Sequence, residues 1–361
     1  MGGSLATVNA SLFGRRSLLL EALIWNCSTQ SHYDTFRAMQ ANHDSESRSP
    51  VVTRRQALSA LSLTGASAAF LSCATAQKAP ARKSSYRYCL NMSTIRGQEL
   101  SVTEEIDVAG KAGYDAIEPW LGKLNQYVNE GGSLSDLRKQ IEDYGMTVES
   151  AIGFASWAVN DPAKRAKGFA DATRDMELLA AIGGKRIAAP PAGVPGNDPV
   201  EPDAAAERYH DLLEVGDKIG VIPQIEMWGG HPSIGKVSTA IYIAIRAGHP
   251  RACFLGDVYH TYKGGSDFDG FRLLSPQALQ VIHMNDYPAD PPQDKIRDEH
   301  RVYPGDGIAP LNEIFGIFES VGAKPVLSLE LFNREYWKMD PLQAAKIGLQ
   351  KMQASVARAG V

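Results

Sequence analysis

The sequence lacks most of the features that would tie it to a disulfide framework, a membrane or a nucleic acid. It has four cysteines in 361 residues, with no Cys-x-x-Cys pair and no Cys/His cluster, which argues against a disulfide framework or a structural zinc site. The formal net charge is -4, so charge gives no reason to expect a nucleic-acid partner. No apolar run of about 20 residues is available to span a membrane. What remains is ordinary globular composition, with 44% hydrophobic residues and enough length for two domains or one large α/β barrel.

A targeting signal is the main feature of the N-terminal part. The arginine pair Arg54-Arg55 precedes a weakly apolar, Ala- and Ser-rich run at 57–76, which ends in the small-x-small site Ala74-Thr75-Ala76. A charged start, a short apolar stretch and a small-residue cleavage site are typical of an export signal, and the paired arginines resemble the bacterial twin-arginine type. We expect residues 51–76 to be this signal and 77–85 a polar linker. A buried Ala-rich helix is the alternative.

Residues 1–50 precede the signal and show no sustained periodicity. Because export signals normally stand at the N-terminus, we interpret this stretch as a non-native upstream extension or a disordered segment, with Met39 as a candidate start. The mature protein is then exported to the periplasm, without stable membrane insertion after cleavage. Lipid attachment at Cys73 is one alternative, although Phe70-Leu71-Ser72 fits a lipobox poorly. A cytoplasmic location is the other, if the signal is not used.

From residue 86 to 361 the chain alternates strand-like and helix-like segments, as βα units do. Expected strands lie at 86–91, 114–120, 147–154, 185–189, 221–226, 252–257, 279–283 and 325–330. Expected helices lie at 102–112, 133–144, 164–182, 204–219, 238–247, 311–321 and 341–358. Eight such units in about 275 residues predict an α/β fold of the (β/α)₈ TIM barrel type. A doubly wound open sheet is disfavoured, because no Gly-rich phosphate loop follows the first strand.

Local signals also mark the helix ends. Ser101 or Thr103 can cap the helix at 102–112, and acidic residues suit its first turn. Gly113 and Gly220 stand where two of the helices should stop.

Four of the expected strands end in a residue that can bind a divalent metal: Glu226, Asp257, His283 and Glu330. They close the fifth to eighth strands, and the carboxyl ends of barrel strands face one mouth, so we expect them side by side on half of the rim. Three carboxylates with one imidazole favour Mn²⁺, Mg²⁺ or Co²⁺ over a thiolate-type zinc site. The alternative is that each carboxylate caps a helix or pairs with a rim cation. The cost of burying three carboxylates together without a cation argues against it.

With their neighbours, these strand ends resemble the xylose-isomerase-like superfamily of sugar and sugar-phosphate isomerases and epimerases, from Tyr86 to the C-terminus. The matching motifs are Ile225-Glu226, Gly256-Asp257-Val258-Tyr259-His260, Ile282-His283-Met284-Asn285-Asp286, Arg301-Val302-Tyr303-Pro304-Gly305-Asp306-Gly307 and Leu329-Glu330. The resemblance implies one divalent metal, Mn²⁺ first and Mg²⁺, Co²⁺ or Zn²⁺ otherwise, on Glu226, Asp257, His283 and Glu330. It implies that the two glutamates act as acid/bases on opposite faces of the substrate, and that His260 and Arg301 contact substrate oxygens.

Further candidates for substrate contacts stand near other strand ends. Glu118 could hydrogen-bond a hydroxyl, and His231 is placed to reach a ligand. Asp286 is expected to orient His283 or Arg301 within the substrate site rather than to bind metal. An apolar wall for a sugar could come from aromatic residues, which are more often core: Trp120, Phe154, Trp157 and Trp228. The thiols of Cys89 and Cys253 are expected to be free and buried.

The predicted function is a metal-dependent isomerase or epimerase that acts on a sugar or keto-polyol by proton abstraction and an enediolate. A dehydratase or lyase acting on a keto-sugar or keto-glycoside shares the first step. A non-catalytic sugar-binding protein is the alternative from another class. The extra histidines of the superfamily's DNA-repair endonucleases and the second metal site and lysine of hydride-shifting aldose isomerases are not visible. Export, with no phosphate loop, favours an unphosphorylated substrate. The oligomeric state is open, with a homo-oligomer as one option.

Overall fold

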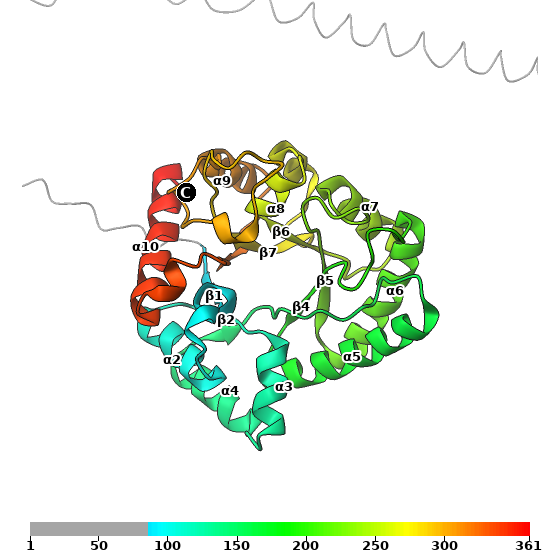
Figure 1. The fold of residues 1–361 in the computed structure, drawn as a ribbon, viewed down its shortest axis with the longest axis horizontal. Helices are drawn as coiled ribbons and strands as arrows, with labels where there is room; N and C mark the ends of the chain where they lie inside the picture. Colours follow the sequence, from blue (N-terminus) through cyan, green and yellow to red (C-terminus); the bar gives the residue numbers. More distant parts are fainter. Residues whose placement is uncertain (1–85) are drawn as a thin grey trace, which may run out of the picture. The chain divides into compact units, whose positions relative to one another are not determined.

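The structure, a computed structural model, describes residues 86–361. The predictions for 1–50, 51–76 and 77–85, including the export signal and Cys73, lie outside the described residues. Within them, eight strands stand around a central axis and the helices form an outer ring (Figure 1). The strands are β1 (Tyr88–Asn91), β2 (Ala116–Glu118), β3 (Thr147–Val148), β4 (Arg186–Ala189), β5 (Ile222–Glu226), β6 (Phe254–Asp257), β7 (Leu279–Met284) and β8 (Val326–Leu329).

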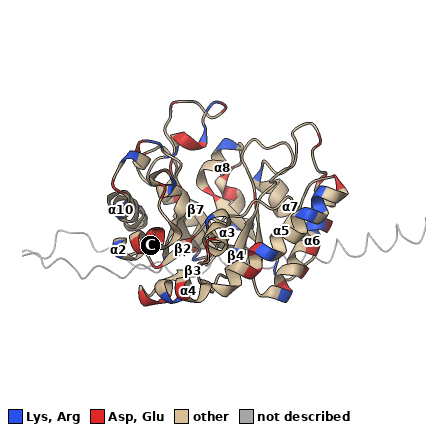
Figure 2. Ribbon diagram, turned by 60° about the horizontal axis from the view of Figure 1, so that its bottom comes forward, with Lys and Arg blue, Asp and Glu red and all other residues tan. Residues whose placement is uncertain are grey.

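The helices follow the strands along the chain. The α-helices are α2 (Val102–Ala112), α3 (Leu121–Asn129), α4 (Leu134–Asp143), α5 (Pro162–Ala181), α6 (Pro202–Ile219), α7 (Val237–Ala247), α8 (Val258–Lys263), α9 (Leu311–Ser320) and α10 (Pro341–Ala359). Short 3₁₀ helices are η1 (Met92–Gln98), η2 (Phe268–Leu273), η3 (Asp298–His300) and η4 (Tyr336–Lys338). Acidic and basic residues are interspersed over the outer helices (Figure 2).

All strand pairs are parallel, in the order β3-β2-β1-β8-β7-β6-β5-β4. The two ends of this order meet where the backbone N–H of Ala188 donates to the carbonyl of Ala151, at 2.9 Å. The fold is therefore the predicted α/β TIM barrel. One small apolar cluster lies in the barrel interior and takes one residue from each of six strands together with Ile152, which follows β3: Cys89, Ala116, Ile152, Ala188, Leu255, Val281 and Val326. A much larger cluster lies between strands and helices.

The local signals for helix ends are confirmed where they were strongest. Ser101 caps α2 in a capping box with Glu104, and Gly113 ends the helix at φ 94°. The sequence did not predict α3 or α8. Helix α3 has no side-chain cap at its N-terminus. Helix α8 has six residues and begins directly after Asp257, whose side chain accepts the backbone N–H of His260.

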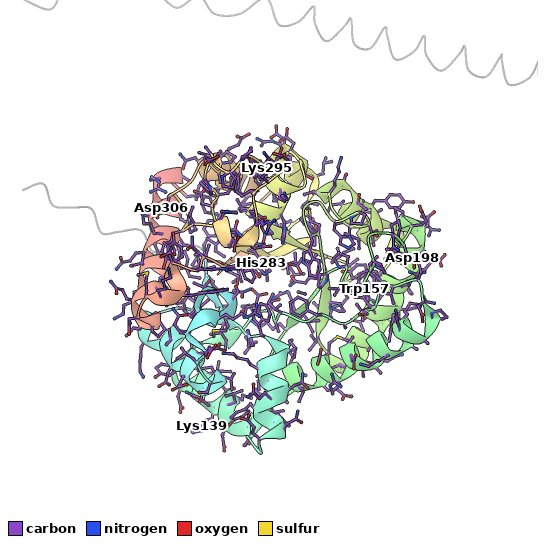
Figure 3. All side chains as sticks on the ribbon, in the orientation of Figure 1. Lys139, Trp157, Asp198, His283, Lys295 and Asp306 are labelled. Atoms are coloured by element: carbon purple, nitrogen blue, oxygen red, sulfur yellow. The ribbon has the colours of Figure 1, made fainter. Side chains whose placement is uncertain are left out.

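Two predictions about buried side chains can be settled at this level. Cys89 and Cys253 are free and buried, as expected. Trp157 belongs to the core: it is 1% exposed, packs on Tyr209 of α6 and donates its indole N–H to the carbonyl of Pro190. Figure 3 places it between the strands and the outer helices, so it contributes nothing to a substrate wall. Within 86–361, no helix has the length and apolar character needed to cross a membrane.

Candidate active site

The carboxyl ends of four adjacent strands bring the predicted metal ligands together. Glu226 ends β5, Asp257 ends β6, His283 is the last residue but one of β7, and Glu330 directly follows β8. The register places Asp257 beside His283, which lies near the centre of the barrel in Figure 3. None of the four side chains belongs to a residue more than 4% exposed. The sequence pattern of apolar strand plus terminal ligand thus corresponds to one buried cluster.

The imidazole of His283 is the centre of this cluster. Its Nδ1 lies 3.1 Å from Glu330 Oε2, 3.6 Å from Asp257 Oδ2 and 3.8 Å from Glu226 Oε1. This buried nitrogen has no hydrogen-bond partner within the described part of the chain. Buried polar atoms are nearly always paired, so an unpaired nitrogen that faces three carboxylates is the place for a cation.

The other ring nitrogen fixes the tautomer. His283 Nε2 lies 3.1 Å from Glu118 Oε2, to which it donates. With the proton on Nε2, the lone pair of Nδ1 points to the carboxylates, as a metal ligand requires. Glu118 is held in turn by Asn91, whose Nδ2 donates to Glu118 Oε2 at 2.9 Å and to Glu330 Oε1 at 3.2 Å. The hydroxyl of Ser328 also donates to Glu118 Oε2, at 2.5 Å.

The donor set fits a divalent cation. Asp257, His283 and Glu330 each offer one ligand atom within 4.8 Å of the others, and Glu226 faces the same nitrogen. Burial raises the pKa of Glu226 to about 8, with Glu330 and Asp257 adding to the shift and His283 opposing it. Burial lowers the pKa of His283, but the carboxylates of Glu330 and Glu118 outweigh it and raise that pKa well above its ordinary value. Both shifts express the same shortage of positive charge.

Among the arginines of residues 86–361, Arg301 is the one that contacts the cluster, and it is 1% exposed. Its Nη1 donates to Asp257 Oδ2 at 3.0 Å and to Glu330 Oε2 at 2.7 Å, the same two oxygens that face His283. Its Nη2 contacts Asp298 and lies 3.1 Å from His260 Nε2. Nδ1 of His260 accepts the backbone N–H of Gly229. Arg301 and His260 therefore brace the ligands as well as standing beside the cavity above them.

A cavity of about 570 Å³ opens over the cluster. It is lined by six of the sequence candidates: Trp120, Glu226, His231, His260, Arg301 and Glu330. Phe154 and Trp228 of the expected aromatic wall line it as well, together with Asp298 and Phe332, which the sequence reading did not single out. Asp257 and His283 lie beneath it with no exposed surface.

Two candidates for substrate contacts lie elsewhere. Glu118 is fully buried, and its Oε2 lies 3.1 Å from His283 Nε2. Asp286 is 1% exposed, and its carboxylate accepts four backbone N–H groups, those of Tyr287, Gly305, Gly307 and Ala309. It holds the Pro-Gly-Asp-Gly loop and does not touch Arg301 or His283 through any of these bonds. Neither side chain lines the cavity, because Glu118 contacts His283 and Asp286 contacts the Pro-Gly-Asp-Gly loop. Substrate contact by these two residues stays a prediction, and this arrangement argues against it.

The fold and the site together define a TIM barrel with a candidate divalent-cation site at the carboxyl ends of its strands. The chain belongs to the xylose isomerase-like TIM barrel family, whose profile matches residues 106–355. It is 23% identical over 277 residues to an inosose isomerase of Bacillus velezensis, which covers 75% of this chain and 98% of that protein. The resemblance found in the motifs is thereby confirmed at the level of the family.

Solved structures share the fold. The crystal structure of the IOLI protein with a binding zinc atom superposes with a TM-score of 0.69 at 20% identity, covering 76% of this chain and 99% of that one. A D-psicose 3-epimerase, solved in the presence of D-fructose, gives 0.63 at 17% identity, covering 76% and 100%. At these identities the similarity establishes the barrel alone.

Proposed function

We propose that the protein is a divalent-metal-dependent isomerase or epimerase that acts on a sugar or keto-polyol. The observation that carries the proposal is the buried Nδ1 of His283, unpaired and facing three carboxylates, directly under a cavity of about 570 Å³. The related inosose isomerase and the D-psicose 3-epimerase have names that fit this chemistry. Location in the periplasm and the segment boundaries at 50, 76 and 85 stay predictions.

Glu226, Asp257, His283 and Glu330 would hold the cation. When bound, it would polarise a substrate carbonyl and acidify the neighbouring C–H. Three carboxylates and one imidazole suit Mn²⁺, with Mg²⁺, Co²⁺ or Zn²⁺ as alternatives, and the IOLI structure contains zinc. Glu118 would keep the imidazole in the tautomer that leaves Nδ1 free.

Glu226 and Glu330 are the candidates for moving the proton, since they are the two ligands that also line the cavity. Glu226 ends β5 and Glu330 directly follows β8, and these are the outer two of the four strands concerned, so the two glutamates can approach a substrate from opposite sides. One carboxylate takes the proton beside the carbonyl and leaves the enediolate of the substrate. Return of a proton by the other carboxylate to the opposite face gives an epimer, and return to the neighbouring carbon gives an isomer.

A dehydratase or lyase acting on a keto-sugar or keto-glycoside is the second candidate. It needs the same proton abstraction and then a donor for the leaving group. His260 lines the cavity beside Arg301 and could supply that proton, which is the observation that favours it. A sugar-binding protein without turnover is the third candidate.

One assay separates the three. Metal-loaded protein is incubated with a panel of ketoses, inososes and keto-glycosides in deuterated water. We expect deuterium at the carbon beside the carbonyl, without net loss of water. Glu226→Gln and Glu330→Gln should each reduce this exchange by about 10²–10⁴-fold, the usual contribution of a positioned acid or base.

Glu149→Gln is the matched control, because Glu149 is also buried but lies outside the cavity. It should exchange at the unsubstituted rate when assayed well below its unfolding temperature. Release of water or an alcohol would favour the lyase. Sugar binding without any deuterium uptake would leave only the binding protein.

A further inference from the structure

A row of five rings forms one wall of the cavity. It runs through Phe332, Trp120, Phe154, Trp228 and His231, with successive ring centroids 6.3, 5.2, 6.2 and 6.3 Å apart. Phe332 stands two residues after Glu330, and Trp228 two residues after Glu226. The row therefore begins beside Glu330 in the sequence and comes beside Glu226 at Trp228, its last ring but one. Between them it follows the half of the mouth that carries none of the four ligands.

Phe154 is the middle of this row and its most open member. It is 48% exposed although it packs between Trp120 and Trp228. It follows β3, and in the strand order β3 lies four strands from β7 in either direction, so Phe154 stands across the barrel from His283. A ring that reacts between Glu226 and Glu330 lies on the ligand side and leaves Phe154 uncovered.

The wall is longer than one substrate ring can cover. A six-membered ring stacks on one aromatic neighbour at about 4.5–7 Å between centroids, whereas five rings stand in the row. The cavity of about 570 Å³ lies within the range of about 300–1,000 Å³ that is usual for pockets holding drug-sized ligands, so it has room for a second ring. The wall also holds an unused donor: the buried indole N–H of Trp120 has no acceptor in the part of the chain that the structure describes. That acceptor would have to be a ligand or a water.

We propose that the substrate has two rings, and that its second ring lies against Phe154 and Trp228. The chemical class is a glycoside of a keto-sugar, whose second ring is another sugar or an aromatic group; both offer an apolar ring face to an aromatic wall. The placing of the first ring rests on the proposed function, which sets the reacting carbon between Glu226 and Glu330. The exposed ring of Phe154 belongs to a concave wall continuous with those glutamates, which favours a ligand over a second protein.

Ketone-free probes test the second ring without relying on catalysis. Glucose, phenyl β-glucoside and cellobiose are titrated into the Mn²⁺-loaded protein, with binding followed by calorimetry. We expect at least one two-ring probe to bind about tenfold tighter than glucose, the gain that one aromatic contact with its buried area can supply. A gain for cellobiose alone identifies a sugar as the second ring, and a gain for the phenyl glucoside alone identifies an aromatic group.

Phe154→Ala should reduce the ratio of two-ring to one-ring affinity to about twofold or less, since the exposed ring supplies most of the contact. Leu273→Ala is the control, because Leu273 is 88% exposed on η2 and outside the cavity, and it should leave the ratio unchanged. No binding of either two-ring probe, a ratio near one, or a ratio that Phe154→Ala does not alter overturns the proposal. The proposal is also overturned if Phe154→Ala changes the oligomeric state of the protein while the ratio of two-ring to one-ring affinity stays the same, because Phe154 would then contact a second protein. If no deuterium exchange occurs but two-ring probes still bind more tightly than glucose, the proposed catalytic function is overturned and the proposed second-ring site is not.

Discussion

The two ends of the barrel contain buried carboxylates in opposite electrostatic settings. At the floor, the carboxylate of Glu149 contacts three cations that stand at the beginnings of β1 and β4: Arg87, Lys185 and Arg186. Glu149 itself directly follows β3 and is 2% exposed. At the mouth, one guanidinium and one imidazole serve four buried carboxylates: Glu118, Glu226, Asp257 and Glu330. The floor has a surplus of positive charge and the mouth has a shortage.

Proton affinities follow this difference. Burial works to raise the pKa of Glu149, but hydrogen bonds from Lys185 and Thr147 and the nearby Arg87 outweigh it and lower the pKa to about 2. Burial with neighbouring carboxylates raises the pKa of Glu226 to about 8. In TIM barrels the floor serves stability and the mouth serves chemistry. Here the cations of the floor already compensate its carboxylate, whereas the proposed divalent cation would compensate the carboxylates of the mouth.

The largest effect should come from supplying that cation. Because a metal binds the folded site and relieves repulsion among its carboxylates, a concentration of a thousand times Kd should raise the unfolding free energy by about 4 kcal/mol. Denaturant unfolding with Mn²⁺ and with a chelator measures the gain. Asp257→Asn should lose most of it, whereas Glu149→Gln should keep it. An equal gain in Asp257→Asn would break the contrast between mouth and floor.

The next effect concerns Glu149 at the floor. Glu149→Gln should lower the unfolding free energy by about 3 kcal/mol at neutral pH, because it removes a buried charge that three cations stabilise. This is the low end of the loss for a broken buried ion pair, since Arg87 and Lys185 are partly exposed. The sign of the pH dependence follows from the lowered pKa. The stabilisation is present above the unfolded value of 4.5 and is lost as the pH falls toward about 2. Urea unfolding of both proteins from pH 7 to pH 3 checks this, and a difference that does not shrink with acid would contradict it.

Features encoded in neighbouring residues were predictable. A short, mainly apolar run that stops at Glu226 or Asp257 identifies both the strand and the rim position of its last side chain. The caps of α2 are local in the same way, since Ser101 and Gly113 act on the turns beside them. The ring of eight strands follows from the order of these local units.

Features that depend on partners far along the chain were not predictable. Glu118 ends a strand as the ligands do, yet its hydrogen bond goes to His283, 165 positions away. The carboxylate of Asp286 binds the loop at Gly305 and Gly307, and the backbone of Asp286 pairs with that of Val302 just before this loop. Asn91 closes the first strand and joins Glu118 to Glu330, and its position at a strand end was the one signal that could have identified it.

The smallest expected effect decides between the two placements of Glu118. If Glu118 orients His283, Glu118→Gln should weaken metal binding by about 10–100-fold, the usual cost of losing a carboxylate behind a ligating imidazole. Turnover at saturating metal should then fall far less than in Glu226→Gln. If Glu118 met the substrate instead, KM would rise while metal affinity stayed the same. Titration of Mn²⁺ into both proteins, followed by kinetics at saturating metal, separates the two. Since Asn91 and Ser328 still hold the glutamine side chain in place, the lost charge and not a collapsed site would account for the weaker binding.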